Sequence, residues 1–557
     1  MSKARYHLIA RIENNRDNLM ILVNWSPAQD DWPQDNILTV LHVSSIKVDP
    51  YLNVDAGTMN PKEHGEVFVL SDGGEVDLDL GNYERYLNIT LTRDNNITTG
   101  KIYQHVIERE RKGEYLGKTV QVVPHITDAI QDWIEKVARI PVDDSGEEPD
   151  VCIIELGGTV GDIESMPFIE AMSQLRRRAG KNNFMQIHVS YVPVIHGEQK
   201  TKPTQQAIKA VRSNGLIPDL IACRCERELE ASAVEKIAHF CQVDNEQVLV
   251  VRDMPSIYQV PMLLEQQKLI PMVRQFLALE GLTITPQMLQ KGKHTWNQWK
   301  SLTGHDTRFH DSVTIALVGK YVELQDSYLS VVKSLEHATM RCRKKLDICW
   351  VDSDHLELKC QTTDPAKFHD AWHKVVKAAA AKWARENKTP YLGICLGMQI
   401  AVIEYARNVC GIKNATSEEF NGDAENKLVM FMPEVDKTTM GGTMRLGLRP
   451  TLFQPGSEWS RLRALYAGKD EILERHRHRY EVIEIKDHPW YVGVQFHPEY
   501  LSRVLDPSRP YLGFVAASAG MLDEITRDYQ QGAPNNLEAE GITNGVSGLK
   551  INGNASF

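Results

Sequence analysis

A cysteine between two glycines is the residue of this sequence whose setting first indicates chemistry. Residues Thr389–Gln399 read TPYLGICLGMQ, so a short apolar run leads into Cys395 and then into a helix predicted over Met398–Val409. Glycines 393 and 397 permit the sharp turn that raises a nucleophile above a sheet. The helix dipole at such a turn favours a thiolate. On this segment alone, a buried structural cysteine is an equally good interpretation.

A histidine and a glutamate further along the chain could activate that cysteine. Residues Trp490–Glu499 read WYVGVQFHPE, an apolar strand that ends at His497, Pro498 and Glu499. The imidazole could take the proton of the thiol, and the carboxylate could orient the imidazole. We therefore predict a relay of Cys395, His497 and Glu499. With these partners, a nucleophilic cysteine is favoured over a structural one.

Two carboxylates in the first half of the chain could bind a metal ion. Glu155 ends the apolar strand predicted at Val151–Leu156, at the edge where open α/β sheets bind ligands. Asp79 could join it as a second hard oxygen ligand for Mg²⁺. The loop that follows can approach a ligand with its backbone amides because it contains Gly157, Gly158 and Gly161.

Two lysines follow in the segment KTKPTQ, residues 200–205. Lys200 and Lys202 stand on an extended segment that runs into a proline, and ammonium groups there are suited to triphosphate oxygens. For an isolated KTK sequence, a solvated surface would be the more common explanation. Beside the carboxylates and the glycine-rich loop, we favour a phosphate site.

The elements that must position these residues predict an α/β fold with two open parallel sheets. Apolar β-branched runs alternate with helix-like segments from about residue 40 to 275. Their continuous apolar character is typical of strands buried on both faces. The clearest predicted strands are Val151–Leu156, Phe184–Val194, Leu220–Cys225 and Val248–Arg252.

The predicted boundaries divide the chain into five parts. An atypical N-terminal segment, 1–43, precedes a first unit, 44–276. Residues 277–311 lose the alternating rhythm and are predicted to be a linker. A strand at Val313–Val318 opens the second unit, 312–520, and residues 521–557 are predicted to be a disordered tail because they are poor in aromatic residues and rich in Asn and Gly.

The composition excludes several classes of protein. Its 42% hydrophobic and 25% charged residues are typical of a globular protein. There is no apolar run of roughly 18 residues and no signal-peptide core, so we predict a cytoplasmic protein. The net charge of −11 argues against nonspecific binding to nucleic acid. The nine cysteines are predicted to be free thiols, with Cys223 and Cys225 in the core rather than on a metal.

Long motifs in the first unit resemble the synthetase domain of the CTP synthases. These motifs are IKVDPYLNVDAGTMNPKEHG (46–65), DLDLGNYER (77–85), ELGGTVGDIES (155–165) and KTKPTQ (200–205). The relay segments resemble the class I glutamine amidotransferases, and GGTMRLG (441–447) and ERHRHRYEV (474–482) resemble the glutaminase half of the CTP synthases. By themselves, the arginines of RHRHR could also form the solvated face of a strand. The resemblance covers roughly residues 44–520.

This resemblance implies a reaction, its ligands and an assembly. ATP phosphorylates O4 of UTP, and ammonia released from glutamine at the cysteine then displaces phosphate to give CTP. Mg²⁺ is required, GTP is an allosteric activator and CTP a feedback inhibitor. The family's synthetase sites are built between the subunits of a homotetramer.

The resemblance also assigns residues to each ligand. The metal ligands would be Asp79 and Glu155. The ATP site would contain Lys47, Arg252, Asp253 and Met254. The UTP and CTP site would be lined by Asp162, Ile163, Glu164, Lys200, Thr201, Lys202, Pro203, Thr204, Gln205 and Lys236. The glutamine site would contain Leu396, Gly397, Met398, Gln399, Glu419 and Arg479.

The chain departs from the family at the phosphate-binding loop. CTP synthases begin with a strand and a loop of the form GGVxSxxGKG, which residues 1–43 lack. Met20–Val23 could be a strand, but it runs into Asn24–Pro27 without a glycine. The segment GEYLGKT, Gly113–Thr119, is one residue short of a phosphate loop and precedes a predicted strand instead of following one, so it is not a substitute.

Two further departures fall in the second unit. Between Trp372 and Lys382 the family carries a strand and a PGGFG loop that forms the oxyanion hole, and near Val482 it carries a further hairpin. A lost five-residue strand forfeits about ten ladder hydrogen bonds at a net of roughly 0.5 to 1.5 kcal/mol each. That loss rivals the whole stability of a domain, about 5 to 15 kcal/mol. Other segments therefore fill the gaps, or the chain folds poorly, or the sequence is an imperfect reading of the gene.

Three hypotheses for function remain. The first is a CTP synthase with a variant or imperfectly read sequence. The second is a catalytically impaired paralogue that binds UTP or CTP and modulates the active enzyme. The third is another amidotransferase joined to a dethiobiotin-synthetase-like domain, which the motif KTKPTQ disfavours.

Overall fold

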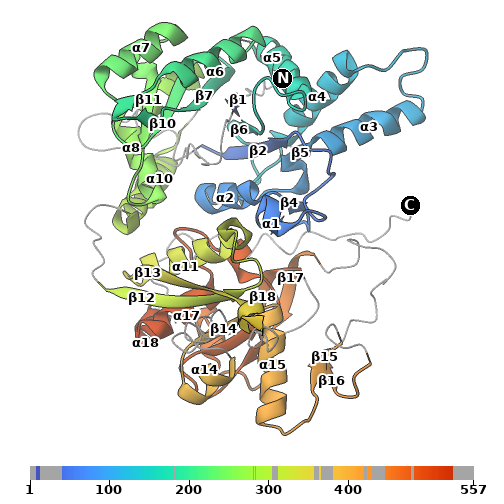
Figure 1. Cartoon of the computed structure of the whole chain (residues 1–557), viewed down its shortest axis with the longest axis vertical. Coiled ribbons are helices and arrows are strands. Elements are labelled where there is room, and N and C mark those ends of the chain that lie inside the picture. Colours follow the sequence, from blue (N-terminus) through green and yellow to red (C-terminus); the bar gives the residue numbers. More distant parts are fainter. Residues whose placement is uncertain are drawn as a thin grey trace.

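The computed structural model has two α/β units, one above the other in Figure 1, with α1 (Pro61–His64) and α2 (Leu78–Leu87) at their junction. The mixed α/β class predicted from the sequence is confirmed. The structure describes residues 8–12, 41–180, 182–279, 282, 284–303, 311–356, 363–364, 381–418, 423–429, 446–477 and 482–530.

The first unit is built on a seven-stranded sheet in the order β11-β10-β7-β1-β6-β2-β5, in which every neighbouring pair is parallel. Its strands are β1 (Leu8–Ile12), β2 (Val43–Asp49), β5 (Asn96–Thr98), β6 (Val151–Leu156), β7 (Phe184–Tyr191), β10 (Leu220–Cys225) and β11 (Val248–Arg252). Three predicted strands have the bounds expected. The fourth ends at Tyr191, and Val194–Ile195 (β8) instead forms an antiparallel pair with Glu198–Gln199 (β9).

The central position of this sheet is filled by β1, from the N-terminal segment predicted to be atypical. Leu8 pairs with Cys152 of β6 on one side and with Phe184 of β7 on the other. An empty position here would leave the edges of two buried strands without hydrogen-bond partners. In this unit another segment occupies the position, which is one of the three alternatives that the sequence leaves open. Met20–Val23, the strand considered for this segment, lies outside the described residues.

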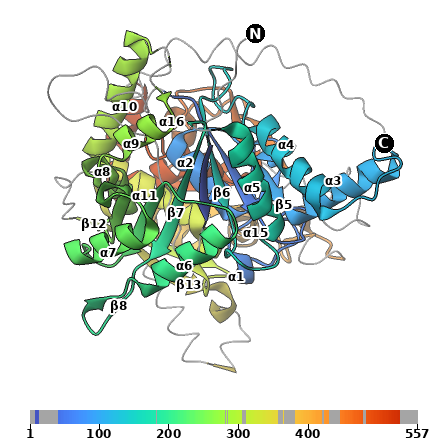
Figure 2. The same ribbon diagram turned by 90° about the horizontal axis from the view of Figure 1, so that it is seen from above.

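Helices cover the sheet on both faces, and the strands lie among them in Figure 2. These helices are α2, α3 (Thr99–Arg111), α4 (Thr127–Val137), α5 (Met166–Ala179), α6 (Lys202–Ser213), α7 (Ala231–Cys241), α8 (Val260–Gln266) and α9 (Leu269–Phe276). Three core clusters lie against the sheet, and they contain Ile187 and Val251, Ile154 and Leu156, and Ile221 and Val250. Strands buried on both faces explain the continuous apolar runs of the sequence. Cys223 and Cys225 are buried free thiols, as predicted.

The predicted linker contains an ordered helix, α10 (Pro286–Thr303), so the expectation of an irregular connection is wrong there. Trp296 and Trp299 of α10 belong to the core of the first unit, and the Trp299 Nε1 donates to the Tyr258 carbonyl at 2.9 Å. The two indoles lie three residues apart on one face of the helix and bury a large apolar area. Gly292 and the lysines on either side of it interrupt the apolar pattern that would have predicted this helix.

The second unit contains two parallel pairs of strands that share one core. Strand β12 (Ser312–Gly319) pairs with β13 (Lys345–Asp352), and β14 (Tyr391–Ile394) pairs with β20 (Tyr491–Val494). Within the described ranges these pairs belong to separate sheets, yet Val313 of β12 and Val492 of β20 belong to one core cluster. The strand predicted at Val313–Val318 is confirmed with one extra residue at each end. Residues 365–380, where the family's oxyanion segment is expected to be missing, lie outside the described residues.

Short strand pairs, one parallel and two antiparallel, and several helices complete the second unit. The remaining strands are β15 (Thr416–Ser417), β16 (Lys427–Val429), β17 (Gly447–Leu452), β18 (Glu471–His476) and β19 (Ile483–Glu484). The helices are α11 (Leu329–Arg341), α14 (Ala381–Asn387), α15 (Leu396–Asn408), α16 (Arg461–Leu465), α17 (Arg509–Ser518) and α18 (Leu522–Gln530). Helix α18 lies in the predicted disordered tail, and its Leu522 and Ile525 are buried, so that prediction is wrong for residues 522–530. Residues 531–557 lie outside the described part of the chain.

Candidate active site

Cys395 stands at the turn between β14 and α15, as the glycines predicted. Its backbone has φ 53° and ψ −107°, a strained conformation for a residue with a side chain. The turn is so tight that a Cβ atom on Gly393 would lie 2.7 Å from the carbonyl carbon of Gly397. Helix α15 begins at Leu396, directly after the cysteine, so the thiol lies at the helix N-terminus.

The structure brings the three predicted relay residues together. The His497 Nδ1 lies 2.7 Å from Glu499 Oε1, and the Tyr511 hydroxyl donates to the other carboxylate oxygen at 3.4 Å. Burial, the largest influence, lowers the pKa of His497, but the Glu499 carboxylate and the hydrogen bond with the Cys395 thiol raise it to about 10. At neutral pH the imidazole is therefore protonated and held between a carboxylate and the sulfur.

Residues outside the predicted relay surround it. The His497 ring stacks on Tyr500 with centroids 5.3 Å apart, and Arg477 pairs with Glu75 of the first unit at 3.2 Å. Arg475, two residues before Arg477, is fully buried, so the interpretation of RHRHR as a solvated basic face is wrong for that arginine. Arginines at alternate positions of a strand lie on one face of it. This spacing in the sequence could have indicated that they share one environment.

Four of the residues assigned to glutamine lie at the start of α15. Leu396 is exposed next to the cysteine and Gly397 follows it in the first turn. Met398 is buried, and its side chain lies against Gly493 of β20. Gln399 is also buried and accepts a hydrogen bond from the Ser417 hydroxyl at 3.3 Å. The side chains of Met398 and Gln399 therefore face the interior. Glu419 and Arg479 lie outside the described residues.

The assigned metal ligands meet at the carboxyl end of the central sheet. Lys47 and Glu155 are neighbours across β2 and β6, with the Lys47 Nζ 3.2 Å from Glu155 Oε1. The same ammonium contacts the Asp79 carboxylate, and the Tyr83 hydroxyl donates to Glu155. All four side chains are buried, although they come from three different elements.

The electrostatics of this cluster fit a divalent cation. Burial is the main cause that raises the pKa of Asp77 and of Asp79, each to about 6, and neighbouring carboxylates add to it. The carboxylates, with Asp49, outnumber the single ammonium of Lys47, whose pKa they raise well above its usual value despite burial. Such an excess of hard oxygen donors suits Mg²⁺. The described residues contain no group of three or more His, Cys, Asp or Glu side chains that could hold a metal ion by themselves.

The residues assigned to UTP divide into exposed and buried side chains. Asp162, Ile163 and Glu164 lie exposed in the loop after β6, and Lys202 and Pro203 are exposed at the start of α6. Lys200, also in this segment, pairs with Glu198 at 2.6 Å.

The other three side chains of the KTKPTQ segment turn inward. Thr201, Thr204 and Gln205 are buried. The Thr204 hydroxyl accepts from Ser190 at 3.0 Å, and the Gln205 amide donates to Thr201 at 3.2 Å. These side chains hold the segment on the sheet, whereas its lysines stay accessible.

The remaining assigned residues lie towards the far edge of the sheet. Lys236 is exposed on α7, where it lines a shallow surface hollow that none of the other assigned residues line. Arg252 pairs with Glu228 at 3.0 Å, Asp253 contacts Arg224, and Met254 is half-buried. In the part of the chain that the structure describes, the hollow that Lys236 lines includes none of the residues of the Lys47 cluster.

The fold and the relay define a class I glutamine amidotransferase unit joined to a synthetase unit. Residues 37–279 match the family model described as CTP synthase N-terminus, and residues 323–490 match the one described as glutamine amidotransferase class-I. The chain belongs to the CTP synthase family. This membership removes the hypothesis of a dethiobiotin-synthetase-like domain.

Curated relatives match both units. The CTP synthase of Neurospora crassa is 61% identical over 538 residues, which cover 88% of this chain and 93% of the relative. The CTP synthase of Schizosaccharomyces pombe is 59% identical over 88% and 89% of the two chains, and CTP synthase 1 of Saccharomyces cerevisiae is 56% identical over 87% and 92%.

A solved structure of the Trypanosoma brucei CTPS glutaminase domain with bound acivicin also matches. It is 31% identical, covers 38% of this chain and 94% of that chain, and has a TM-score of 0.33. Within the described residues, no helix is both long enough and apolar enough to cross a membrane.

Proposed function

We propose that the chain is a glutamine-hydrolysing CTP synthase of the cytoplasm, which aminates UTP to CTP at the expense of ATP. The observation that supports this most directly is the His497 imidazole, held 2.7 Å from Glu499 and hydrogen-bonded to the Cys395 thiol. Identities of 56% to 61% with proteins named CTP synthase favour this function over a paralogue that only modulates the enzyme.

The relay supplies the chemistry of glutamine hydrolysis. The Cys395 sulfur attacks the carbon of the side-chain amide, and His497 gives its proton to the departing ammonia. A thioester remains on the sulfur, and water, deprotonated by His497, then releases glutamate and restores the thiol. Glu499 keeps the imidazole oriented throughout. Leu396 and Gly397 lie next to the sulfur, and Met398, Gln399, Glu419 and Arg479 complete the proposed glutamine site.

The buried cluster of the first unit supplies the metal and phosphate site. Asp79 and Glu155 would hold Mg²⁺, which neutralises triphosphate charge when it is bound. Lys47 would contact phosphate oxygens, and adenine would lie near residues 252–254. UTP or CTP would bind at residues 162–164, 200–205 and Lys236. We also propose a homotetramer with GTP as activator and CTP as feedback inhibitor, since exposed groups such as Ile163 and Lys202 are free to meet a ligand held by another subunit.

The departures from the family limit the rate of the chain. The residues after β1, Glu13 to Asp17, contain no glycine, and the oxyanion segment expected between residues 372 and 382 is missing from the sequence. Loss of one oxyanion donor lowers kcat about 10²- to 10³-fold in other acyl-transfer enzymes. Glutamine hydrolysis should therefore be at least about 10²-fold slower than in a version with the loop restored.

The test measures glutamate release and CTP formation with glutamine and then with ammonium chloride. We expect slow release of glutamate that the change Cys395→Ala abolishes and the change of the exposed Cys410→Ala does not. Ammonium chloride should not restore CTP formation, because the ATP loop is lost independently. Normal turnover with either nitrogen source would contradict our account of the departures, and peptide mapping across residues 43, 376 and 482 would then show whether the native chain contains the missing loops.

A further inference from the structure

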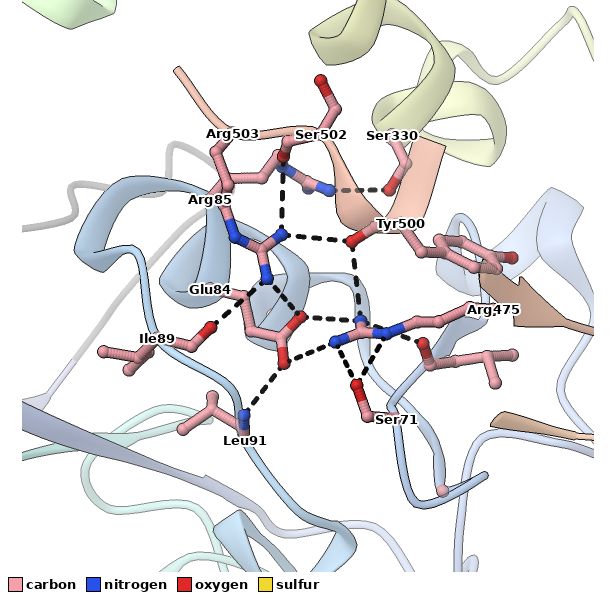
Figure 3. Close-up of polar contacts among 12 residues, drawn as sticks. Ser71, Glu84, Arg85, Ile89, Leu91, Ser330, Arg475, Tyr500, Ser502 and Arg503 are labelled. Carbon is pink, nitrogen blue, oxygen red and sulfur yellow. Dashed lines mark hydrogen bonds and ion pairs between the residues drawn. The ribbon is translucent and has the colours of Figure 1, made fainter. Parts of the chain in front are cut away.

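A buried cluster of charged side chains joins the two units (Figure 3), and it contacts the segment that contains the relay residues His497 and Glu499. Glu84 of α2 accepts two hydrogen bonds from Arg475 of β18, at 2.7 and 3.0 Å, and both side chains have no exposed surface. Arg503, which follows the relay in the sequence, lies 3.4 Å from the same carboxylate. One carboxylate of the synthetase unit therefore anchors two guanidinium groups of the glutaminase unit.

These two arginines hold the backbone on both sides of Glu499. The His497 amide donates to the Arg475 carbonyl at 2.9 Å, which fixes the residue that carries the imidazole. The Tyr500 carbonyl accepts from Arg475 at 3.5 Å and from Arg503 at 3.2 Å. The segment 497–500 thus contacts two side chains that Glu84 holds, together with the Ser71 hydroxyl and the carbonyls of Val69 and Ile89.

Further contacts tie the same segment to the first unit. The Tyr500 hydroxyl donates to the Val67 carbonyl at 3.1 Å, while its ring stacks on the His497 imidazole. Arg477 pairs with Glu75 at 3.2 Å. The glutaminase unit adds the Tyr511 hydroxyl on the Glu499 carboxylate and the Ser334 hydroxyl on the Glu499 carbonyl, at 3.4 and 3.3 Å. The relay is therefore held from both units.

A buried ion pair that only joins two domains would explain part of this arrangement. Buried charges are poor stabilisers, however, because apolar side chains of similar volume usually stabilise an interface as well. The bidentate geometry of Arg475 and Glu84 fixes orientation, which an apolar contact does not. The two guanidinium groups also share one carboxylate, so their charges are not fully balanced by it. The arrangement therefore serves the orientation of the side chains more than their neutralisation.

We propose that Glu84 is a positioning residue for the glutaminase relay, acting through Arg475 and Arg503 on the backbone that carries His497 and Glu499. The inference rests on the proposed function, since it concerns the relay of that function. It assigns to the synthetase unit a part in the geometry of the other unit's active site.

The experiment compares Glu84→Gln with the unchanged chain and with Glu170→Gln, an exposed carboxylate of α5. Alkylation of the Cys395 peptide is followed by mass spectrometry with a glutamine-like chloroketone, with iodoacetate and with iodoacetamide. A small misplacement of reacting groups slows reactions by about 10- to 100-fold. We expect a loss of that size in the chloroketone rate for Glu84→Gln and no loss for Glu170→Gln.

The ratio of iodoacetate to iodoacetamide rates separates positioning from a simple change of charge. Removing the negative charge of Glu84 would by itself raise this ratio, because it favours the anionic reagent. Moving the protonated His497 away from the sulfur lowers the ratio, and this is the result we expect. Arg503→Gln keeps the pair of Glu84 and Arg475 and should show a smaller change in the same direction, so it replaces Glu84→Gln if that variant does not fold.

The possible failures are distinguishable. An unchanged chain that the chloroketone does not alkylate at Cys395 would overturn the relay and this inference together. A reactive unchanged chain with identical rates and ratios in Glu84→Gln would overturn the inference and leave the relay standing. A lower melting temperature with unaltered alkylation would show that Glu84 only stabilises the interface, which also overturns it.

Discussion

The charge on His497 is the property of the relay that one substitution should change most. Its pKa is raised from 6.5 to about 10. A difference of about 3.5 units corresponds to about 5 kcal/mol in favour of the imidazolium. Burial opposes this charge, so Glu499 and Cys395 together supply at least that amount. Of these two, the Glu499 carboxylate makes the larger contribution. Glu499→Gln should therefore lower the pKa of His497 well below 10, towards its ordinary value of 6.5.

Two reagents that differ in charge measure this change at Cys395. Iodoacetate and iodoacetamide alkylate the same sulfur, and an adjacent imidazolium favours the anionic reagent. In the unchanged chain the ratio of the two rates should stay high and fall only near pH 10, whereas in Glu499→Gln it should fall at a distinctly lower pH. Cys410 is exposed and serves as an internal reference that should not differ between the two proteins. Coinciding pH profiles at Cys395 would refute the reasoning.

The same protonation contributes to stability with a defined sign. The pKa of His497 is higher in the folded chain than its ordinary value of 6.5, so the folded chain holds a proton that the unfolded chain releases between pH 6.5 and about 10. This contribution, on the order of a few kcal/mol, is complete below pH 6.5 and is lost as the pH rises towards 10. Urea unfolding should show a steeper loss of stability with pH in the unchanged chain than in Glu499→Gln.

Further predictions concern nucleotide binding, the cysteine turn and the core. Calorimetry should detect UTP or CTP binding but an ATP affinity weakened by at least about 100-fold relative to a version with the family's phosphate loop, because several charge-assisted bonds of roughly 1.5 to 3 kcal/mol are lost; tight Mg²⁺-dependent ATP binding would contradict this. Gly393→Ala should prevent correct formation of the turn, since its Cβ would lie 2.7 Å from Gly397, and should abolish alkylation of Cys395 by the chloroketone. Trp296→Ala should lower the free energy of unfolding by about 3 to 5 kcal/mol, measured by urea denaturation, whereas a truly irregular linker would tolerate it.

Sequence patterns over a few residues correctly predicted the elements whose conformation depends on neighbouring residues. Strands such as Val151–Leu156 are continuous apolar runs bounded by turn residues, and the glycines beside Cys395 leave few alternatives to a sharp turn. The relay could also be predicted, because His497 and Glu499 stand at the end of a strand that pairs with the one before the cysteine.

Long-range pairing explains what the sequence did not reveal. The strand Leu8–Ile12 is short and contains an arginine, and only its two neighbours in the sheet define it. The helix Pro286–Thr303 is masked by a glycine and by lysines, and its tryptophans find their core in another part of the chain. The pair of Glu84 and Arg475 joins positions 391 residues apart, a separation at which no local pattern carries information.

Because the synthetase unit anchors the relay, the glutaminase unit is difficult to use separately or in a chimeric protein. Excising residues 312–530 as a free-standing glutaminase would remove Glu84, Glu75 and the Val67 carbonyl, and it would leave Arg475 and Arg503 without the carboxylate that neutralises them. A chimera that joins this glutaminase unit to the synthetase unit of another protein would lack the same contacts, unless that unit has an acidic residue at the position of Glu84. The boundary between the two units is therefore a poor site for recombination, even though only one polypeptide segment connects them.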